Sequence, residues 1–216
     1  MIRKRIKFSL IIVILTFFAQ CKKGQISYKG VDFNDQNIYL FYRETNSKAG
    51  MISKSYNIHQ SNYSHVGIGF LDGNQVVVYH ILHDKDNEQN FKYSELIKDT
   101  LDEFYNPKND EVVGGEILSL NDVSQNEIDK IKKVTLELEN KDLHFDEEFT
   151  SVHDDKFYCS ELVYYILHRI NDRITIEKTL KKLTGIDKIM LKRDSIFYYP
   201  ADAFIDTPWF TSLKKW

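Results

Sequence analysis

The sequence predicts an α+β fold in which an antiparallel sheet packs against a helix that carries a cysteine. Residues 64–80 contain two apolar runs around Asp-Gly, the dipeptide most typical of a tight β-hairpin. Residues 124–139 and 158–170 instead space their apolar side chains three and four residues apart, as amphipathic helices do. Strand and helix patterns therefore occur in one stretch of chain, with no linker between them.

The predicted hairpin brings two histidines together. If residues 72–73 form a type I′ turn, His65 lies directly opposite His80 on one face of the sheet. Alternation turns the apolar side chains of the first strand to the other, core-facing side, namely Val66, Ile68 and Phe70. Gly67 and Gly69 share the histidine face, where a backbone or a ligand can approach closely. The alternative is a half-buried hairpin with two polar residues on its solvent face.

The remaining elements follow from local patterns. Strands are expected at residues 37–42, 111–120 and 196–199, helices at 94–104, 124–139, 158–170 and 176–183, a helix or loop at 47–59, and loops at 83–90 and 145–155. Gly114-Gly115 indicates a bulge or bend in the strand that contains it. Ser124 and Glu127 form a capping box, which marks the start of a helix. We find no internal repeat and no second domain.

Residues 1–21 are expected to be a lipoprotein-type signal peptide. A basic segment and an apolar run of signal-peptide length precede Cys21, and the run is too short for a comfortable membrane span. The pattern resembles a bacterial lipoprotein signal, in which the cysteine is lipidated, although Gln20 departs from the small residue usual before it. The alternative is an uncleaved amino-terminal anchor. Residues 22–36 would then be a tether and residues 37–216 a domain in the cell envelope, outside the cytoplasm.

Charge and cysteine content narrow the function. The net charge is −3 and no basic run follows the signal, so the electrostatic footprint of nucleic-acid binding is missing. The chain has two cysteines, and lipidation of Cys21 would leave Cys159 as a lone thiol in an exported domain. A disulfide framework is excluded, and a reactive thiol becomes a candidate.

Cys159 lies in the first turn of the helix predicted at residues 158–170. A helix amino terminus carries partial positive charge and free N–H groups, which favour a thiolate and can donate to an oxyanion. His65 would be the base and His80 the group that orients it. The acidic residues that precede Cys159 would raise its pKa, so His65 would have to supply most of the activation. The alternative is an inert cysteine of the core.

Three short motifs resemble a known family. Residues 64–68 (SHVGI) and 158–163 (YCSELV) resemble the YiiX/YaeF-like branch of the NlpC superfamily of cysteine hydrolases, and residues 199–202 (YPAD) are similar to its carboxy-terminal segment. The resemblance implies a circularly permuted papain-like fold, with Cys159 as nucleophile and His65 as the strand histidine. The branch often has glutamate where this chain has His80, although the lecithin:retinol acyltransferase relatives use histidine there.

The sequence therefore predicts an exported, lipid-anchored thiol hydrolase that needs no cofactor. The resemblance implies a cell-wall peptide or an acylated lipid as substrate, with cleavage of an amide or an ester. The alternatives are an acyltransferase that works through a thioester on Cys159, a binding lipoprotein without catalysis, and a metal site built from His65, His80 and Cys159. The oligomeric state is left open.

Overall fold

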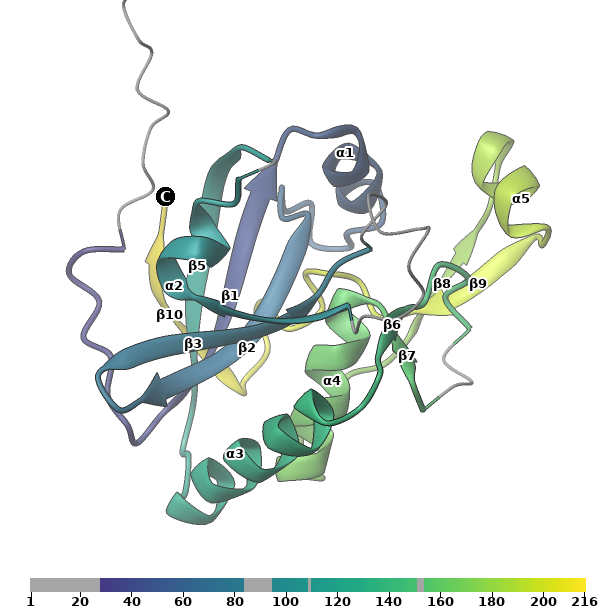
Figure 1. Ribbon diagram of the computed structural model, residues 1–216. Coiled ribbons are helices and arrows are strands. Elements are labelled where there is room, and N and C mark those ends of the chain that lie inside the picture. Colours follow the sequence, from purple (N-terminus) through teal and green to yellow (C-terminus); the bar gives the residue numbers. More distant parts are fainter. Residues whose placement is uncertain (1–27, 84–94, 109, 151–153) are drawn as a thin grey trace, which may run out of the picture.

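The structure, a computed structural model, describes residues 28–83, 95–108, 110–150 and 154–216, and its centre is a six-stranded antiparallel sheet (Figure 1). The strand order is β10-β5-β1-β2-β3-β4. Its strands are β1 (Ile38–Thr45), β2 (His65–Asp72), β3 (Gln75–Ile81), β4 (Leu96–Thr100), β5 (Val112–Leu120) and β10 (Phe210–Lys215). The predicted antiparallel sheet is thus present. The strand β10 was missed, because its polar sequence shows no apolar alternation.

Both faces of this sheet are buried, each by different helices. The first face packs against α3 (Gln125–Glu139) and α4 (Cys159–Ile170), which cross below the sheet in Figure 1. The second face is covered by α2 (Leu101–Tyr105) and by partly buried residues of segment 28–33. Side chains alternate between the two cores: Val66, Ile68 and Phe70 of β2 join the first, as predicted.

The two predicted long helices are confirmed. The helix α3 begins after Ser124, whose hydroxyl accepts from the Glu127 N–H while the Glu127 carboxylate accepts from the Ser124 N–H, so the capping box is present. The helix α4 begins at Cys159 and buries the apolar residues expected of it, Leu162, Val163, Ile166, Leu167 and Ile170. A short helix, α1 (Lys48–Lys54), occupies the segment predicted as helix or loop.

The hairpin is present, but its register differs from the predicted one. Residue 72 pairs with residue 75, so the turn is Gly73-Asn74 rather than Asp72-Gly73. Gly73 has a φ of 62°, whereas Asn74 is not among the residues with positive φ, which is the pattern of a type II′ turn. This turn needs positive φ only at glycine, while the predicted one would also impose it on Asp72. His80 therefore lies across from Gly67, diagonal to His65 but on the same face.

Two predicted helices are wrong. The described part of segment 94–104 contains the edge strand β4 followed by α2, and Thr100 ends the strand and caps the helix with Glu103. Segment 176–183 contains a strand, β8 (Thr179–Lys182), which pairs with β9 (Ser195–Tyr198), and the unpredicted helix α5 (Gly185–Leu191) lies between them. In both segments hydrogen bonds to a neighbouring strand prevail over a weak helical spacing of apolar residues.

The acidic segment before α4 is more ordered than a solvated loop. Two short strands, β6 (His144–Phe145) and β7 (Lys156–Phe157), pair in parallel around it. Asp146 is buried and accepts hydrogen bonds from the N–H groups of Glu148 and Thr150. The carboxylate thus shapes the turn that leads back to the amino end of α4.

Candidate active site

The amino end of α4 differs from those of α1, α2 and α3, because no side chain caps it. Tyr158 occupies the N-cap position, and its hydroxyl instead accepts from the backbone N–H of Tyr199 at 2.8 Å. The Ser160 hydroxyl donates to the carbonyl oxygen of Tyr199 at 2.6 Å. The YPAD segment is therefore pinned beside Cys159, and no side chain caps the amino end of α4 there.

The segment that contains YPAD also orders the loop before β2. The Asp202 carboxylate is fully buried and accepts from the N–H groups of Ile58 and His59 at 3.0 and 2.8 Å. It also accepts from the Ser61 hydroxyl at 3.1 Å. These contacts hold the chain that enters β2 against the carboxy-terminal segment that supports Cys159.

Cys159 packs against β2 at the residue next to His65. The backbone N–H groups of Val66 and Ser160 lie toward the sulfur and lower the pKa of the Cys159 thiol. The nearby Arg43 guanidinium lowers it further. Burial is the largest cause and acts in the opposite direction, so the pKa of the thiol is raised overall. The side chain is still partly exposed, as a nucleophile must be.

The two predicted histidines meet in a series of hydrogen bonds. Nε2 of His65 lies 3.0 Å from Nδ1 of His80, and both side chains are buried. Nε2 of His80 in turn lies 3.0 Å from Oδ2 of Asp99 on the edge strand β4. The Asp99 side chain is partly exposed, so the series runs from the buried His65 toward the surface.

The Asp99 carboxylate at the outer end of the series determines which atom donates in each hydrogen bond. A carboxylate oxygen accepts, so Nε2 of His80 carries a proton and donates to Asp99. In neutral His80 the other nitrogen, Nδ1, then accepts from the Nε2–H of His65. This leaves Nδ1 of His65 without a proton, ready to accept one. The tautomer that a general base needs is thus set by two residues behind it.

Neutral histidines are favoured by their surroundings. Burial, the Arg43 guanidinium and His80 hold the pKa of His65 well below its ordinary value. Burial also lowers the pKa of His80, although the hydrogen bond to Asp99 opposes this effect. Phe104 of α2 packs on both rings, with ring centroids 5.9 Å from His65 and 5.1 Å from His80. The face that Gly67 was expected to leave open is therefore filled.

Gly67 has a packing role on this face. A Cβ atom built on it would lie 2.7 Å from Cγ1 of Val78 and 3.2 Å from the Phe104 ring. The glycine thus admits the aromatic cover of the histidines rather than a ligand.

Arg43 is the most unusual neighbour of this series. It pairs with His65 across β1 and β2, is 4% exposed, and places its guanidinium 4.8 Å from the centre of the Phe104 ring. Nη1 donates to the Phe104 carbonyl at 2.8 Å, whereas Nε has no hydrogen-bond partner within the described parts of the chain. A buried positive charge beside His65 disfavours an imidazolium there, so the resting pair is a neutral thiol and a neutral imidazole.

This result overturns one expectation. The amino end of α4 was predicted to depress the pKa of Cys159, but burial outweighs the N–H groups and raises it. The acidic residues at 146–148 and 154–155 are not among the causes of this shift. A stable thiolate–imidazolium pair is therefore not the resting state of the site.

Asp99 and Arg43 are site residues that the sequence reasoning missed. Asp99 was assigned to a helix, so its place beside His80 across β3 and β4 was not foreseen. Arg43 follows five consecutive apolar or aromatic residues of β1, Ile38–Tyr42. An arginine in such a buried strand was a readable signal, because a fully buried arginine is rare.

The side-chain cluster does not fit a metal centre. The facing nitrogens of His65 and His80 share one proton, and the other nitrogen of His80 is held by Asp99. Within the described ranges, no group of three or more His, Cys, Asp or Glu side chains is arranged to hold a metal ion. Of the ligand set that was weighed from the sequence, His80 therefore has both ring nitrogens engaged in hydrogen bonds.

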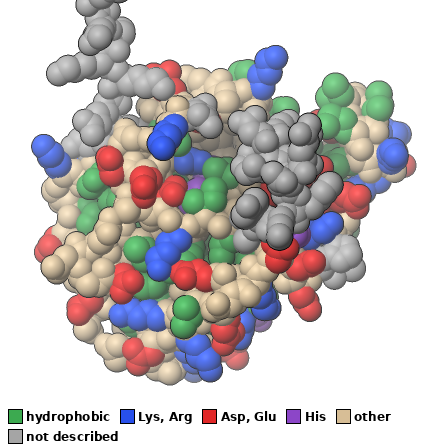
Figure 2. Space-filling model, in the orientation of Figure 1, with side chains coloured by type: hydrophobic (Ala, Val, Ile, Leu, Met, Phe, Trp, Pro, Cys, Tyr) green, Lys and Arg blue, Asp and Glu red, His purple; other side chains and the backbone are tan. Residues whose placement is uncertain are grey.

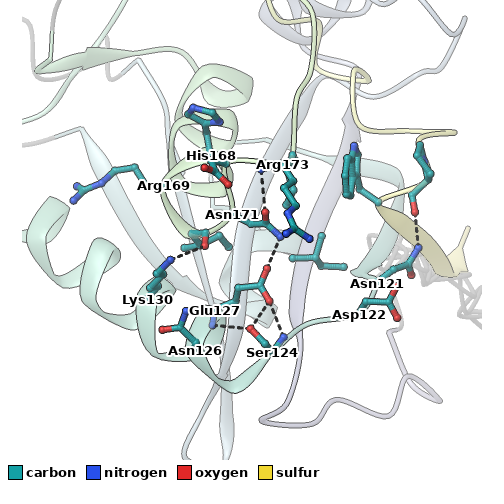
Figure 3. Close-up of a pocket in the computed structure, with 16 residues that line it drawn as sticks. Asn121, Asp122, Ser124, Asn126, Glu127, Lys130, His168, Arg169, Asn171 and Arg173 are labelled. Carbon is teal, nitrogen blue, oxygen red and sulfur yellow. Dashed lines mark hydrogen bonds between the residues drawn. The ribbon is translucent and has the colours of Figure 1, made fainter.

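A broad groove of about 800 Å³ lies away from these residues (Figure 3). It is formed by the amino end of α3, the carboxy end of α4 and the turn at residues 208–209. Its polar groups bind one another: the Glu127 carboxylate accepts from Ser124 and Asn171, and Lys130 donates to the Ile170 carbonyl. None of the predicted site residues lines it, so it is a structural junction between two helices.

Cys21 and the rest of the predicted signal lie outside the described residues. Within the described parts of the chain, no helix is long and apolar enough to cross a membrane. The lipid anchor therefore stays a prediction.

Comparisons with known proteins address the fold. No family model matches the chain, and no curated protein matches it either. Among solved structures, the chain is similar to YiiX from Escherichia coli O157:H7, which is described as a metalloprotein, with a TM-score of 0.59 and 14% identity over 84% of this chain and 97% of that chain. The predicted likeness to YiiX is thus confirmed at the level of fold, whereas a permuted papain-like topology and membership of the NlpC superfamily stay predictions.

Proposed function

We propose that the chain is a thiol hydrolase that cleaves an amide or ester bond through Cys159, His65 and His80. The observation that carries the proposal is the hydrogen-bonded series from His65 through His80 to Asp99, which starts in β2 one residue before Val66, the residue of that strand against which Cys159 lies. Nucleophile, base and orienting group are the parts that covalent acyl chemistry requires. Asp99 is a fourth member of the proposed site, because the tautomer of His80 is fixed by its hydrogen bond to the Asp99 carboxylate.

In the acylation step, the sulfur of Cys159 attacks the carbonyl carbon of the substrate. Nδ1 of His65 takes the thiol proton during the attack, because neither group is charged at rest. The oxyanion that forms accepts a hydrogen bond from the backbone N–H of Cys159. The imidazolium at His65 then gives its proton to the leaving amine or alcohol, which departs as a thioester forms on Cys159.

In the deacylation step, water attacks the thioester while Nδ1 of His65 takes a proton from it. The product acid leaves, and the Cys159 sulfur regains its proton from His65. His80 and Asp99 act by holding the tautomer of His65 and by placing a carboxylate charge behind the transient imidazolium. Arg43 stabilises the negative charge on sulfur and keeps the resting imidazole neutral.

We also propose that the domain is exported and lipid-anchored through Cys21, in the cell envelope of a bacterium. The support is the short apolar run that ends at this cysteine. In the native host, Cys21→Ser should block processing or release the protein from the membrane fraction. Unchanged mass and membrane association would contradict the anchor without bearing on the thiol chemistry.

The hydrolase proposal is tested with an activated acyl ester that releases a coloured alcohol. The parent chain should release it in a burst equal to the enzyme concentration, followed by steady turnover, with an acyl mass on Cys159. His65→Gln should suppress both phases, whereas the exposed His59→Gln, a matched change of histidine, should suppress neither.

The outcomes separate the alternatives. A burst whose acyl group passes to an added alcohol or amine in preference to water identifies an acyltransferase. No burst and no adduct on folded protein identifies a binding protein that lacks the chemistry. A rate that falls with a chelator and returns with zinc contradicts the thiol mechanism, because that mechanism needs no metal.

A further inference from the structure

The most exposed apolar surface of the described chain lies on an arm formed by residues 178–198, which comprises β8, α5 and β9 and projects from the body in Figure 1. Five large apolar side chains of this arm are 53–74% exposed: Leu180, Ile186, Ile189, Met190 and Phe197. Figure 2 shows hydrophobic side chains gathered at its outer end, with basic ones beside them. A patch of this kind marks an interaction site.

The helix α5 presents its apolar side to solvent. Ile186, Ile189 and Met190 follow the spacing i, i+3 and i+4, so they form one stripe on the helix. Asp187 lies off this stripe and accepts a hydrogen bond from the Tyr56 hydroxyl of the body at 2.9 Å. No residue of α5 is fully buried. A surface helix normally turns its apolar stripe inward, so this one is built to meet an apolar partner.

The adjoining hairpin extends the same surface. Leu180 pairs with Phe197 across β8 and β9, and both are exposed, whereas Ile196 and Tyr198 of the same strand are buried against the body. The Tyr198 hydroxyl donates to the Tyr56 carbonyl at 2.5 Å. The arm is thus fixed at its base, and its apolar outer face is a permanent feature of the fold.

The charge of the arm identifies the partner. Acidic side chains in it are Asp187 and Asp194, and basic ones are Lys178, Lys181, Lys182, Lys188, Lys192 and Arg193. The arm is therefore strongly basic in a chain of net charge −3, and Asp194 is already paired with Lys188 at 2.5 Å. Lys178 and Lys181 lie over the rings of Tyr199 and Tyr56, whereas Lys182 and Lys192 are exposed. Exposed apolar residues together with exposed basic ones match an anionic lipid surface. Two such arms would repel one another, which disfavours pairing of two copies through this surface.

We propose that the arm docks on an anionic lipid bilayer, with the α5 stripe and the Leu180–Phe197 pair inserted among the lipids. The proposal does not rest on the thiol chemistry. The base of the arm packs with Tyr158 and Tyr199, so docking of the arm holds the amino end of α4 near the bilayer. A lipid on Cys21, seven residues before the first described residue, would keep the domain within about 25 Å of the same surface.

The test uses an environment-sensitive fluorophore at Met190→Cys in the full chain, with Cys21→Ser and Cys159→Ser removing the native thiols. Emission should rise and shift to the blue with vesicles that contain phosphatidylglycerol, and much less with phosphatidylcholine alone. A label at Leu136→Cys, an apolar position on α3 that lies outside the arm and is 59% exposed, should not respond. Lys182→Gln and Lys192→Gln should each weaken binding roughly fivefold.

Ile189→Asp should abolish the response at position 190, whereas the matched Leu136→Asp should not, and circular dichroism should show both variants folded. The proposal is overturned if the label at 190 stays unchanged while sedimentation shows the chain on anionic vesicles. It is also overturned by equal responses at 136 and 190, by a response that ignores lipid charge, or by a response that rises with protein concentration without vesicles.

Discussion

The amino ends of α3 and α4 differ in capping: side chains cap α3, whereas none caps α4. At α3, Ser124 and Glu127 satisfy the free N–H groups and the helix end faces solvent. At α4, no side chain caps the helix, and the first residue is Cys159. An unsatisfied helix end costs stability, since one cap is worth about 1 kcal/mol. At α4 no side-chain cap offsets this cost, and the Ser160 N–H lies toward the Cys159 sulfur, where it favours negative charge.

The comparison distinguishes a residue that stabilises the fold from one that serves the chemistry. Removing the cap of α3 should change stability and leave activity alone, whereas changing the amino end of α4 should do the reverse. Four predictions test this contrast, from the largest effect to the smallest.

Cys159→Ala should have the largest effect. Turnover of the activated ester should fall by at least about 10³-fold, because no other group of the site can form the thioester. The melting temperature should stay close to that of the parent, since the change leaves the N–H groups of α4 in place. Steady-state rates and thermal melts measure the two quantities. Residual turnover above a tenth of the parent rate would show that the nucleophile is another residue.

His80→Phe should lower turnover by about 100-fold, because it removes the acceptor that fixes the tautomer of His65. His80→Asn and His80→Glu keep an acceptor and should retain much of the activity. Asp99→Leu should lower the rate by less, and Asp99→Asn less again, since Asn can still accept from His80. If His80→Phe turns over like the parent with its fold intact, the hydrogen-bonded series has no catalytic role.

The stabilising contributions of the His65–His80 pair and of Glu127 at the amino end of α3 should be lost at different pH values. The pKa values of His65 and His80 are lowered in the fold, so below about pH 6.5 the unfolded chain binds their protons first and stability falls, by up to about 1.4 kcal/mol per pH unit for each histidine. Hydrogen bonds from Ser124 and Asn171 outweigh burial and lower the pKa of Glu127, so its contribution is lost only at more acid pH. Urea unfolding at several pH values should show two steps, and His80→Asn should reduce only the first.

Ser124→Ala should have the smallest effect. It removes the cap of α3 and should lower the free energy of unfolding by about 1 kcal/mol, with turnover unchanged. Ser124→Asp keeps an acceptor and should cost much less. Chemical denaturation and ester turnover give the two values. A loss of activity in Ser124→Ala without a loss of stability would erase the contrast between the two helix ends.

Local patterns were enough to locate the elements with strong signals. The α3 helix was predicted from its capping box, the α4 helix from its apolar spacing, and the central hairpin from Asp-Gly between two apolar runs. The face shared by His65 and His80 was also predicted correctly even though the turn was displaced. The wrong turn shifted the pairing by two residues, and a shift of two preserves the face on which each side chain lies.

What the sequence determined by itself is therefore the presence of the sheet, the cysteine at a helix start and the two histidines on one face of a strand pair. The tertiary structure decided the rest. Asp99 reaches His80 because segment 96–100 pairs as an edge strand with β3, which its local pattern did not reveal. The pKa of Cys159 is raised because burial between α4 and β2 outweighs the helix end, and burial is a property of packing that no local pattern contains.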